Sequence, residues 1–141
     1  MGETGLPHVD SFVLDGDGGV LDDTLLHAAI ECIDAAASRR PMFYSISCVH
    51  PSTVARALRD ERAFSDLDAR RLVGFKANAL ALSTEELVWL DHPEGDDPES
   101  FAGGMWGIHE EFGLRILGGC CGTGDRYTRA QATRMADASS A

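Results

Sequence analysis

Short apolar runs alternate with amphipathic stretches along the chain, and this alternation predicts repeated strand-helix units. Runs at 9–14, 42–48, 71–78 and 114–117 have the apolar, aromatic and β-branched content typical of buried strands. Helical periodicity follows at about 22–37, from 52 to 58, from 83 and over 98–112, and at about 125–136. The order strand-helix, repeated four times, predicts an α/β fold with a parallel sheet.

Local signals set the expected boundaries of these elements. Arg39-Arg40-Pro41 ends the first helix, Ser52 is the expected N-cap of the second, and Ser83 with Glu86 offers a capping box. The acidic run 91–99 contains prolines and a glycine, which is typical of a solvated loop. We expect one folded domain over 9–136, a disordered segment over 1–8 and a flexible tail over 137–141.

Chemically reactive residues gather in the loops that follow the predicted strands. In parallel βα folds these loops share one rim of the sheet, and ligands bind there. The four loops carry Asp15 and Asp17, then Cys48 and His50, then Asn78, and finally Cys120 and Cys121. The three cysteines are therefore expected to converge although they lie far apart in the sequence.

Composition limits the classes of partner. The 141 residues, 44% of them hydrophobic, suffice for one core, and the net charge of −11 repels phosphate backbones and anionic lipid surfaces. Nucleic acid and membranes are therefore not expected as partners. The start of the chain lacks the basic and apolar regions of a secretion signal, so a cytoplasmic protein is expected.

Three of the four cysteines are placed as metal ligands would be. A reducing compartment disfavours stable disulfides, and Cys32 falls on a helix face beside Ile33, where we expect it to be core. Catalytic zinc sites have three protein ligands and an open position, which matches Cys48, Cys120 and Cys121.

The adjacent pair of cysteines needs a special backbone to share one metal. Neighbouring side chains of an extended strand point to opposite faces, so the chain must turn sharply at Cys120 and Cys121, and Gly118, Gly119 and Gly122 permit such a turn. Two alternatives stay open: small buried residues without a metal, and a strained vicinal disulfide or redox pair.

Two strings carry a family resemblance. The run Gly118-Gly119-Cys120-Cys121-Gly122-Thr123 resembles the hallmark of the homocysteine S-methyltransferase family, and Ser47-Cys48-Val49-His50-Pro51 is similar to the segment with its third cysteine. The strand ending in Lys76-Ala77-Asn78-Ala79 also resembles a family strand that ends near the substrate pocket. The similarity spans about 9–132.

This resemblance implies a fold, a metal and a reaction. The family fold is a (β/α)8 TIM barrel of typically about 250 residues, so the chain corresponds to a partial barrel, about the last four βα units. It implies Zn2+ held by Cys48, Cys120 and Cys121, and an enzyme that transfers a methyl group to the thiol of homocysteine, as in methionine biosynthesis. Homocysteine and a small methyl donor are the implied partners. Asn78 and Thr123 are the candidate substrate-binding residues, with turn formation and helix capping as their alternative roles.

Two other functions compete with this one. A catalytically incomplete half-barrel would bind zinc, a companion half or a second copy of itself, because open sheet edges invite pairing. The run from Asp15 to Asp22 also resembles the opening motif of haloacid-dehalogenase-like phosphatases, with Asp96-Asp97 as a thin Mg2+ candidate. A calcium loop starting at Asp15 is excluded because its twelfth residue is Leu26.

Overall fold

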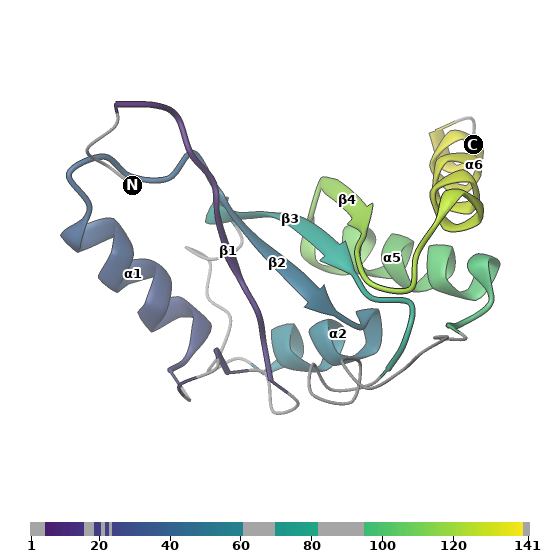
Figure 1. Cartoon of the computed structure of the whole chain (residues 1–141), viewed down its shortest axis with the longest axis horizontal. Coiled ribbons are helices and arrows are strands. Elements are labelled where there is room, and N and C mark those ends of the chain that lie inside the picture. The colour runs from purple at the N-terminus through teal and green to yellow at the C-terminus, as the bar shows by residue number, and fades with distance from the viewer. Residues whose placement is uncertain are drawn as a thin grey trace.

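Four parallel strands form one sheet in the computed structural model, in the order in which they occur along the chain (Figure 1). The structure describes residues 5–15, 19–20, 22, 24–60, 70–81 and 95–139. The strands are β1 (Asp10–Phe12), β2 (Tyr44–Val49), β3 (Leu72–Ala77) and β4 (Ile116–Gly119). The helices are α1 (Leu26–Ala36), α2 (Pro51–Arg59), α5 (Pro98–Phe112) and α6 (Asp125–Ser139). The predicted α/β class with a parallel sheet is confirmed.

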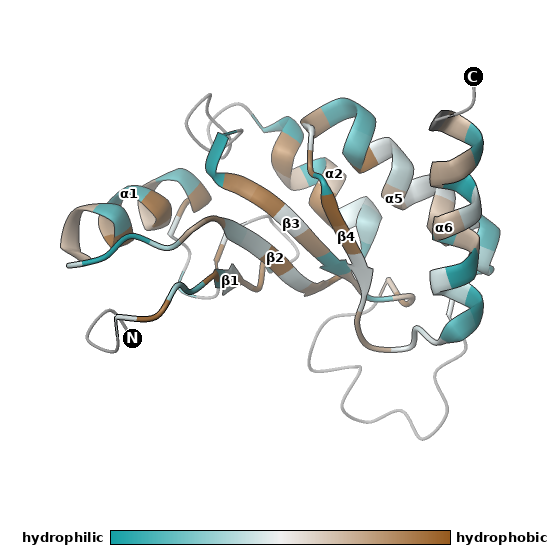
Figure 2. Cartoon of the chain, turned by 90° about the horizontal axis from the view of Figure 1, so that it is seen from above, coloured by the Kyte–Doolittle hydropathy of each residue, from teal (hydrophilic) through white to brown (hydrophobic). Residues whose placement is uncertain are grey.

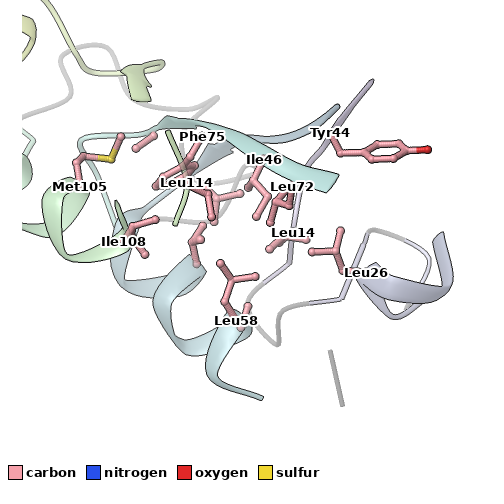
Figure 3. Packing of buried hydrophobic residues seen from close by; sticks show 14 of the residues in the cluster. Leu14, Leu26, Tyr44, Ile46, Leu58, Leu72, Phe75, Met105, Ile108 and Leu114 are labelled. Atoms are coloured by element: carbon pink, nitrogen blue, oxygen red, sulfur yellow. The ribbon is translucent and has the colours of Figure 1, made fainter. Parts of the chain in front are cut away.

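One face of the sheet carries the hydrophobic core. Ile46 of β2 and Phe75 of β3 point toward the helices, where Leu58 of α2 and Met105 of α5 meet them (Figure 3). All four side chains are at most 3% exposed. Figure 2 shows α5 and α6 side by side beyond β4, and Phe101 of α5 packs edge-on against Tyr127 of α6. Burial of these apolar side chains fixes the helices against the sheet.

The opposite face of the sheet is lined by small and polar side chains. Because side chains alternate along a strand, the neighbours of Ile46 and Phe75 point away from the core. Ser45 and Ser47 each lie within hydrogen-bond distance of Ser11, at 2.9 and 2.5 Å between hydroxyl oxygens. Ser45 pairs with Gly74, and Ser47 pairs with Lys76, whose side chain is exposed. These four positions of β2 and β3 therefore add no large apolar side chain to this face.

The structure corrects two local predictions. His50, not Ser52, is the N-cap of α2, and its ring Nδ1 accepts a hydrogen bond from the backbone N–H of Ser52 at 3.2 Å. Pro51 then occupies the first turn, where its missing N–H costs nothing. Cys32 is exposed rather than part of the core. The predicted capping box at Ser83 lies outside the described residues.

The remaining boundaries differ from the prediction by a few residues. Helix α5 begins and ends as predicted, whereas α1 starts at Leu26 and α6 continues to Ser139. Strand β4 starts at Ile116, two residues later than predicted. Leu114 is fully buried, and Arg115 donates its backbone N–H to the carbonyl of Val73 just ahead of the strand pairing. Within the described part of the chain, no helix has the length and apolar character that a membrane span requires.

Candidate metal centre

Cys48 lies in a bulge at the carboxyl end of β2. The pairing with β3 shifts between Ser47 and Val49, so Cys48 is the extra residue on its strand. Its φ of 59° is left-handed, and among the described non-glycine residues it is the only one with a positive φ. The bulge turns the Cys48 side chain away from the normal alternation of the strand, toward the loop that follows β4.

Cys120 and Cys121 occupy the turn that follows β4. Cys120 donates its backbone N–H to Ala77 at 2.7 Å, and Cys121 accepts from the N–H of Ala79 at 3.1 Å, so this turn is attached to the end of β3. Gly122, with a φ of 74°, completes the reversal. The sharp turn that the glycines were expected to permit is present.

The three thiols meet at the rim of the sheet. The Sγ atoms of Cys48, Cys120 and Cys121 all lie within 4.8 Å of one another, and those of Cys48 and Cys120 are 2.7 Å apart. All are free thiols, so the disulfide alternative is not realised in this structure. Cys121 is exposed and the other two are half-buried, which leaves one side of the cluster open. The predicted convergence of the thiols is confirmed.

The pKa values of the three thiols are shifted in different directions. Burial raises the pKa of the Cys48 thiol to about 12, and the neighbouring cysteines add to that rise. Burial acts on Cys120 as well, but hydrogen bonds from the Cys48 thiol and the Cys121 backbone outweigh it and lower the pKa of Cys120. Burial and the charge of Cys120 raise the pKa of Cys121. Without a cation, the cluster therefore favours a single thiolate. Three thiolates require a cation that compensates their negative charge.

The donor set fits a zinc ion. Thiolates bind zinc at about 2.3 Å, and a tetrahedral arrangement places two such sulfurs about 3.8 Å apart. The observed separations run from 2.7 Å, between Cys48 and Cys120, to at most 4.8 Å, a range that includes that value. Three soft sulfur ligands with an open side favour zinc over magnesium or calcium.

Asn78 lies directly behind the thiols and is fully buried. Its Nδ2 donates to the carbonyl oxygen of Cys48 at 2.8 Å, and its backbone N–H donates to Val49 at 3.0 Å. Since a carbonyl can only accept, the amide nitrogen must face Cys48, and Oδ1 points elsewhere. Oδ1 has no hydrogen-bond partner among the described residues.

Thr123, the other candidate substrate-binding residue, closes the turn after the cysteines. Its hydroxyl donates to the carbonyl oxygen of Cys120 at 2.7 Å, and its backbone N–H donates to the same oxygen at 3.2 Å. The hydroxyl proton is therefore already committed within the turn. The turn leads directly into α6, which begins at Asp125.

The structure adds two charged residues that spacing does not reveal. The carboxylate of Asp96 accepts a hydrogen bond from His50 Nε2 at 2.9 Å. This bond connects the loop before α5 to the start of α2. Lys76, on the polar face of β3, contributes to the lowered pKa of Cys120. Only the alternation along β3 could have placed Lys76 on this face, and no local signal pairs His50 with Asp96.

The phosphatase motif has a structural role where it is described. Asp15 Oδ1 accepts from the backbone N–H of Gly19 at 3.1 Å, next to an isolated antiparallel bridge between Leu14 and Val20. Asp17 lies outside the described residues. Asp97 caps α5 by accepting from the backbone N–H of Ser100 at 3.1 Å. No magnesium-binding group is formed by these acids within the described residues.

These observations define the class of protein as an α/β protein with a parallel sheet and, at its rim, a three-thiol cluster that could hold a metal ion. The model of the homocysteine S-methyltransferase family matches residues 2–135, almost the whole chain. The chain belongs to this family. Searches of curated proteins and of solved structures returned no significant match.

Proposed function

We propose that this chain holds zinc through Cys48, Cys120 and Cys121 and uses the site to transfer a methyl group to the thiol of homocysteine. The observation that carries the proposal is the meeting of three sulfur atoms within 4.8 Å in a chain that belongs to this family. The product would be methionine, which assigns the chain to methionine biosynthesis. The four-stranded sheet would then correspond to the last four units of the family's barrel.

The chemistry needs a sulfur nucleophile at neutral pH. Bound zinc would supply a Lewis acid that lowers the pKa of the homocysteine thiol. The homocysteine thiol would lose its proton to solvent, and its sulfur would form the new S–C bond while the demethylated donor departs with the electron pair of the bond that breaks. The three cysteines give up their thiol protons to hold the ion, and Lys76 offsets part of their negative charge.

The hydrogen bonds around the site favour one orientation of the amino acid. Asn78 has an unpartnered Oδ1 acceptor, which would suit the amino group of homocysteine. The carboxylate would face the turn at Thr123 and the N–H groups that open α6, where the helix dipole favours negative charge. Thr123 would contribute there by keeping the turn closed.

The first test measures zinc content per chain together with methionine formation. Protein with the native sequence is expected to hold about one zinc ion per chain, and Cys120→Ser is expected to lose most of it because one of three ligands is removed. Cys32→Ser is the matched control, since Cys32 is exposed on α1 and far from the cluster in sequence. Absence of zinc from freshly reduced native protein would overturn the assignment.

A second candidate function is zinc binding without turnover. It is favoured by the open sheet, in which β1 and β4 each have a single neighbour among the described strands. The remaining strands of a barrel would be needed to enclose substrate. Stoichiometric zinc with no methionine, in the presence of homocysteine and sulfonium, ammonium or folate methyl donors, would support this second function.

A further inference from the structure

Cys48 has a backbone conformation that its own side chain does not favour. Non-glycine residues in the left-handed region are uncommon and are retained where the surrounding structure holds them. Cys48 combines a φ of 59° with a position in a β-bulge, so it lacks the ladder pairing that fixes its neighbours. Some other contact has to maintain the bulge if its thiol is to face Cys120.

Asn78 supplies that contact from the neighbouring strand end. Its Nδ2 donates to the carbonyl oxygen of Cys48 at 2.8 Å, while its backbone N–H donates to Val49 at 3.0 Å. The two bonds fix the two successive peptide groups that follow Cys48. Asn78 is fully buried, so water cannot replace the side-chain bond without opening the core.

The segment around Asn78 also holds the second ligand loop. Ala77 accepts from the backbone N–H of Cys120, and Ala79 donates to Cys121, at 2.7 and 3.1 Å. These bonds use backbone groups only, so they survive a change of side chain at 78. The Nδ2 donor of Asn78 thus serves the Cys48 side of the cluster.

We propose that Asn78 is a positioning residue for the metal centre: its amide holds the Cys48 bulge so that the Cys48 thiol meets those of Cys120 and Cys121. This inference rests on the proposed function, because it assumes that the three thiols bind a metal. Asn78 touches no thiol itself. Its loss is expected to weaken metal binding while all three ligands remain.

The test compares Asn78→Asp with the native sequence by Co2+ titration and zinc competition. Aspartate keeps the shape of asparagine but replaces the donor with a carboxylate oxygen, which cannot donate to Cys48. We expect a tenfold to hundredfold loss of Co2+ and Zn2+ affinity, in the range typical of residues that support metal ligands. We also expect a weaker thiolate-to-cobalt absorption band, because Cys48 no longer reaches the ion in every molecule.

A matched control separates positioning from general stability. Gln131→Glu makes the same amide-to-acid change at a buried residue of α6, which is 8% exposed and has no hydrogen bond to a thiol within the described part of the chain. Gln131→Glu should leave affinity and absorption unchanged even if it lowers the melting temperature. If Asn78→Asp does not fold without metal, Asn78→Ala, which removes the donor without adding charge, replaces it in the same titration.

The outcomes distinguish the two proposals. Failure of the native protein to bind Co2+ or Zn2+ would overturn both the proposed function and the positioning role. Native binding with unchanged affinity and absorption in the Asn78 variants would overturn the positioning role alone. Weaker binding in the Asn78 variants, with Gln131→Glu binding as the native protein does, would support it.

Discussion

Individual atoms decide the shape of the turn that carries the two adjacent cysteines. A Cβ atom added at Gly119 would lie 2.7 Å from Thr123 Cβ and closer still to Thr123 Oγ1. Thr123 therefore already fills that position, and its hydroxyl donates a hydrogen bond to the carbonyl oxygen of Cys120. At Gly118, one residue earlier, the nearest atom would be Lys76 Cγ at 3.8 Å, an ordinary contact. Glycine is therefore required at position 119, because Thr123 lies too close for a Cβ atom, whereas position 118 has room for one.

We predict that Gly119→Ala destabilises the protein and weakens its zinc binding. The added methyl group displaces Thr123 and breaks its bond to Cys120, and overpacking of this kind costs about 1–3 kcal/mol. Urea unfolding of the metal-free protein and zinc competition measure the two effects. Gly118→Ala is the matched control and should change neither by much. Equal behaviour of the two variants would show that the turn yields without cost.

At this scale the sequence predicted the meeting of the thiols but not the means by which they meet. The strand-end rule needs only the order of elements, and it brought Cys48 to Cys120 and Cys121. The left-handed backbone of Cys48 is bonded, through its carbonyl oxygen, to the side chain of Asn78, 30 positions away. No local pattern encodes a contact of that kind.

At the scale of elements, the end of the sheet opposite the thiols is held by a half-buried ion pair. Arg71, just before β3, donates to both carboxylate oxygens of Asp34 in α1 at 2.9 and 3.1 Å. Tyr44, which begins β2, donates its hydroxyl to Asp34 at 2.7 Å and lies beneath the Arg71 guanidinium. The three residues connect a helix to two strands, far from the site along the strand direction.

We predict that Asp34→Asn lowers the free energy of unfolding by about 1–3 kcal/mol at neutral pH, because Arg71 and Tyr44 lose a charged acceptor. Burial raises the pKa of Asp34, but the bonds from Arg71 and Tyr44 outweigh it and hold that pKa below its ordinary value of 3.8. The contribution is therefore complete above the unfolded-state pKa and is lost as the pH falls through the folded-state pKa.

Urea unfolding at a series of pH values checks this prediction. The difference between native and Asp34→Asn proteins should be constant near neutrality and should shrink on acidification below about pH 4. Glu111→Gln, which breaks the exposed pair between Arg59 and Glu111, is the control and should have little effect. A difference that persists unchanged at low pH would assign the effect to packing instead of charge.

Elements were predicted best where periodicity is strong and worst where side chains compete for a terminus. Helix α5 was placed correctly because Asp97, Pro98 and a following Gly113 mark both of its ends. The start of α2 was missed by two residues because a histidine ring replaced the expected serine hydroxyl as the cap. Ring nitrogens can accept the same backbone N–H, but histidine is not among the usual capping residues.

The whole molecule presents an open edge and an uncovered polar face. Strand β4 has β3 as its single neighbour among the described strands, and Ile116 at its start is 51% exposed. Ile116 pairs with Gly74, so it lies on the same face as Ser45 and Lys76, away from the core. In a closed barrel this face would line the interior. An exposed isoleucine at an open edge is a template for pairing.

We predict that the isolated 141-residue chain associates through this edge, and that salt strengthens the association by screening its net charge of −11. Ile116→Lys should shift sedimentation toward the monomer, because it removes the apolar contact and places a charge on the edge strand. Met135→Lys is the matched control: Met135 is 42% exposed on α6, and the variant adds the same charge on a helix instead of on the edge strand. A monomer at every salt concentration would show that the polar face and the short β4 suffice to protect the edge. Equal loss of association in both variants would show that the added charge, and not the edge contact, explains the loss.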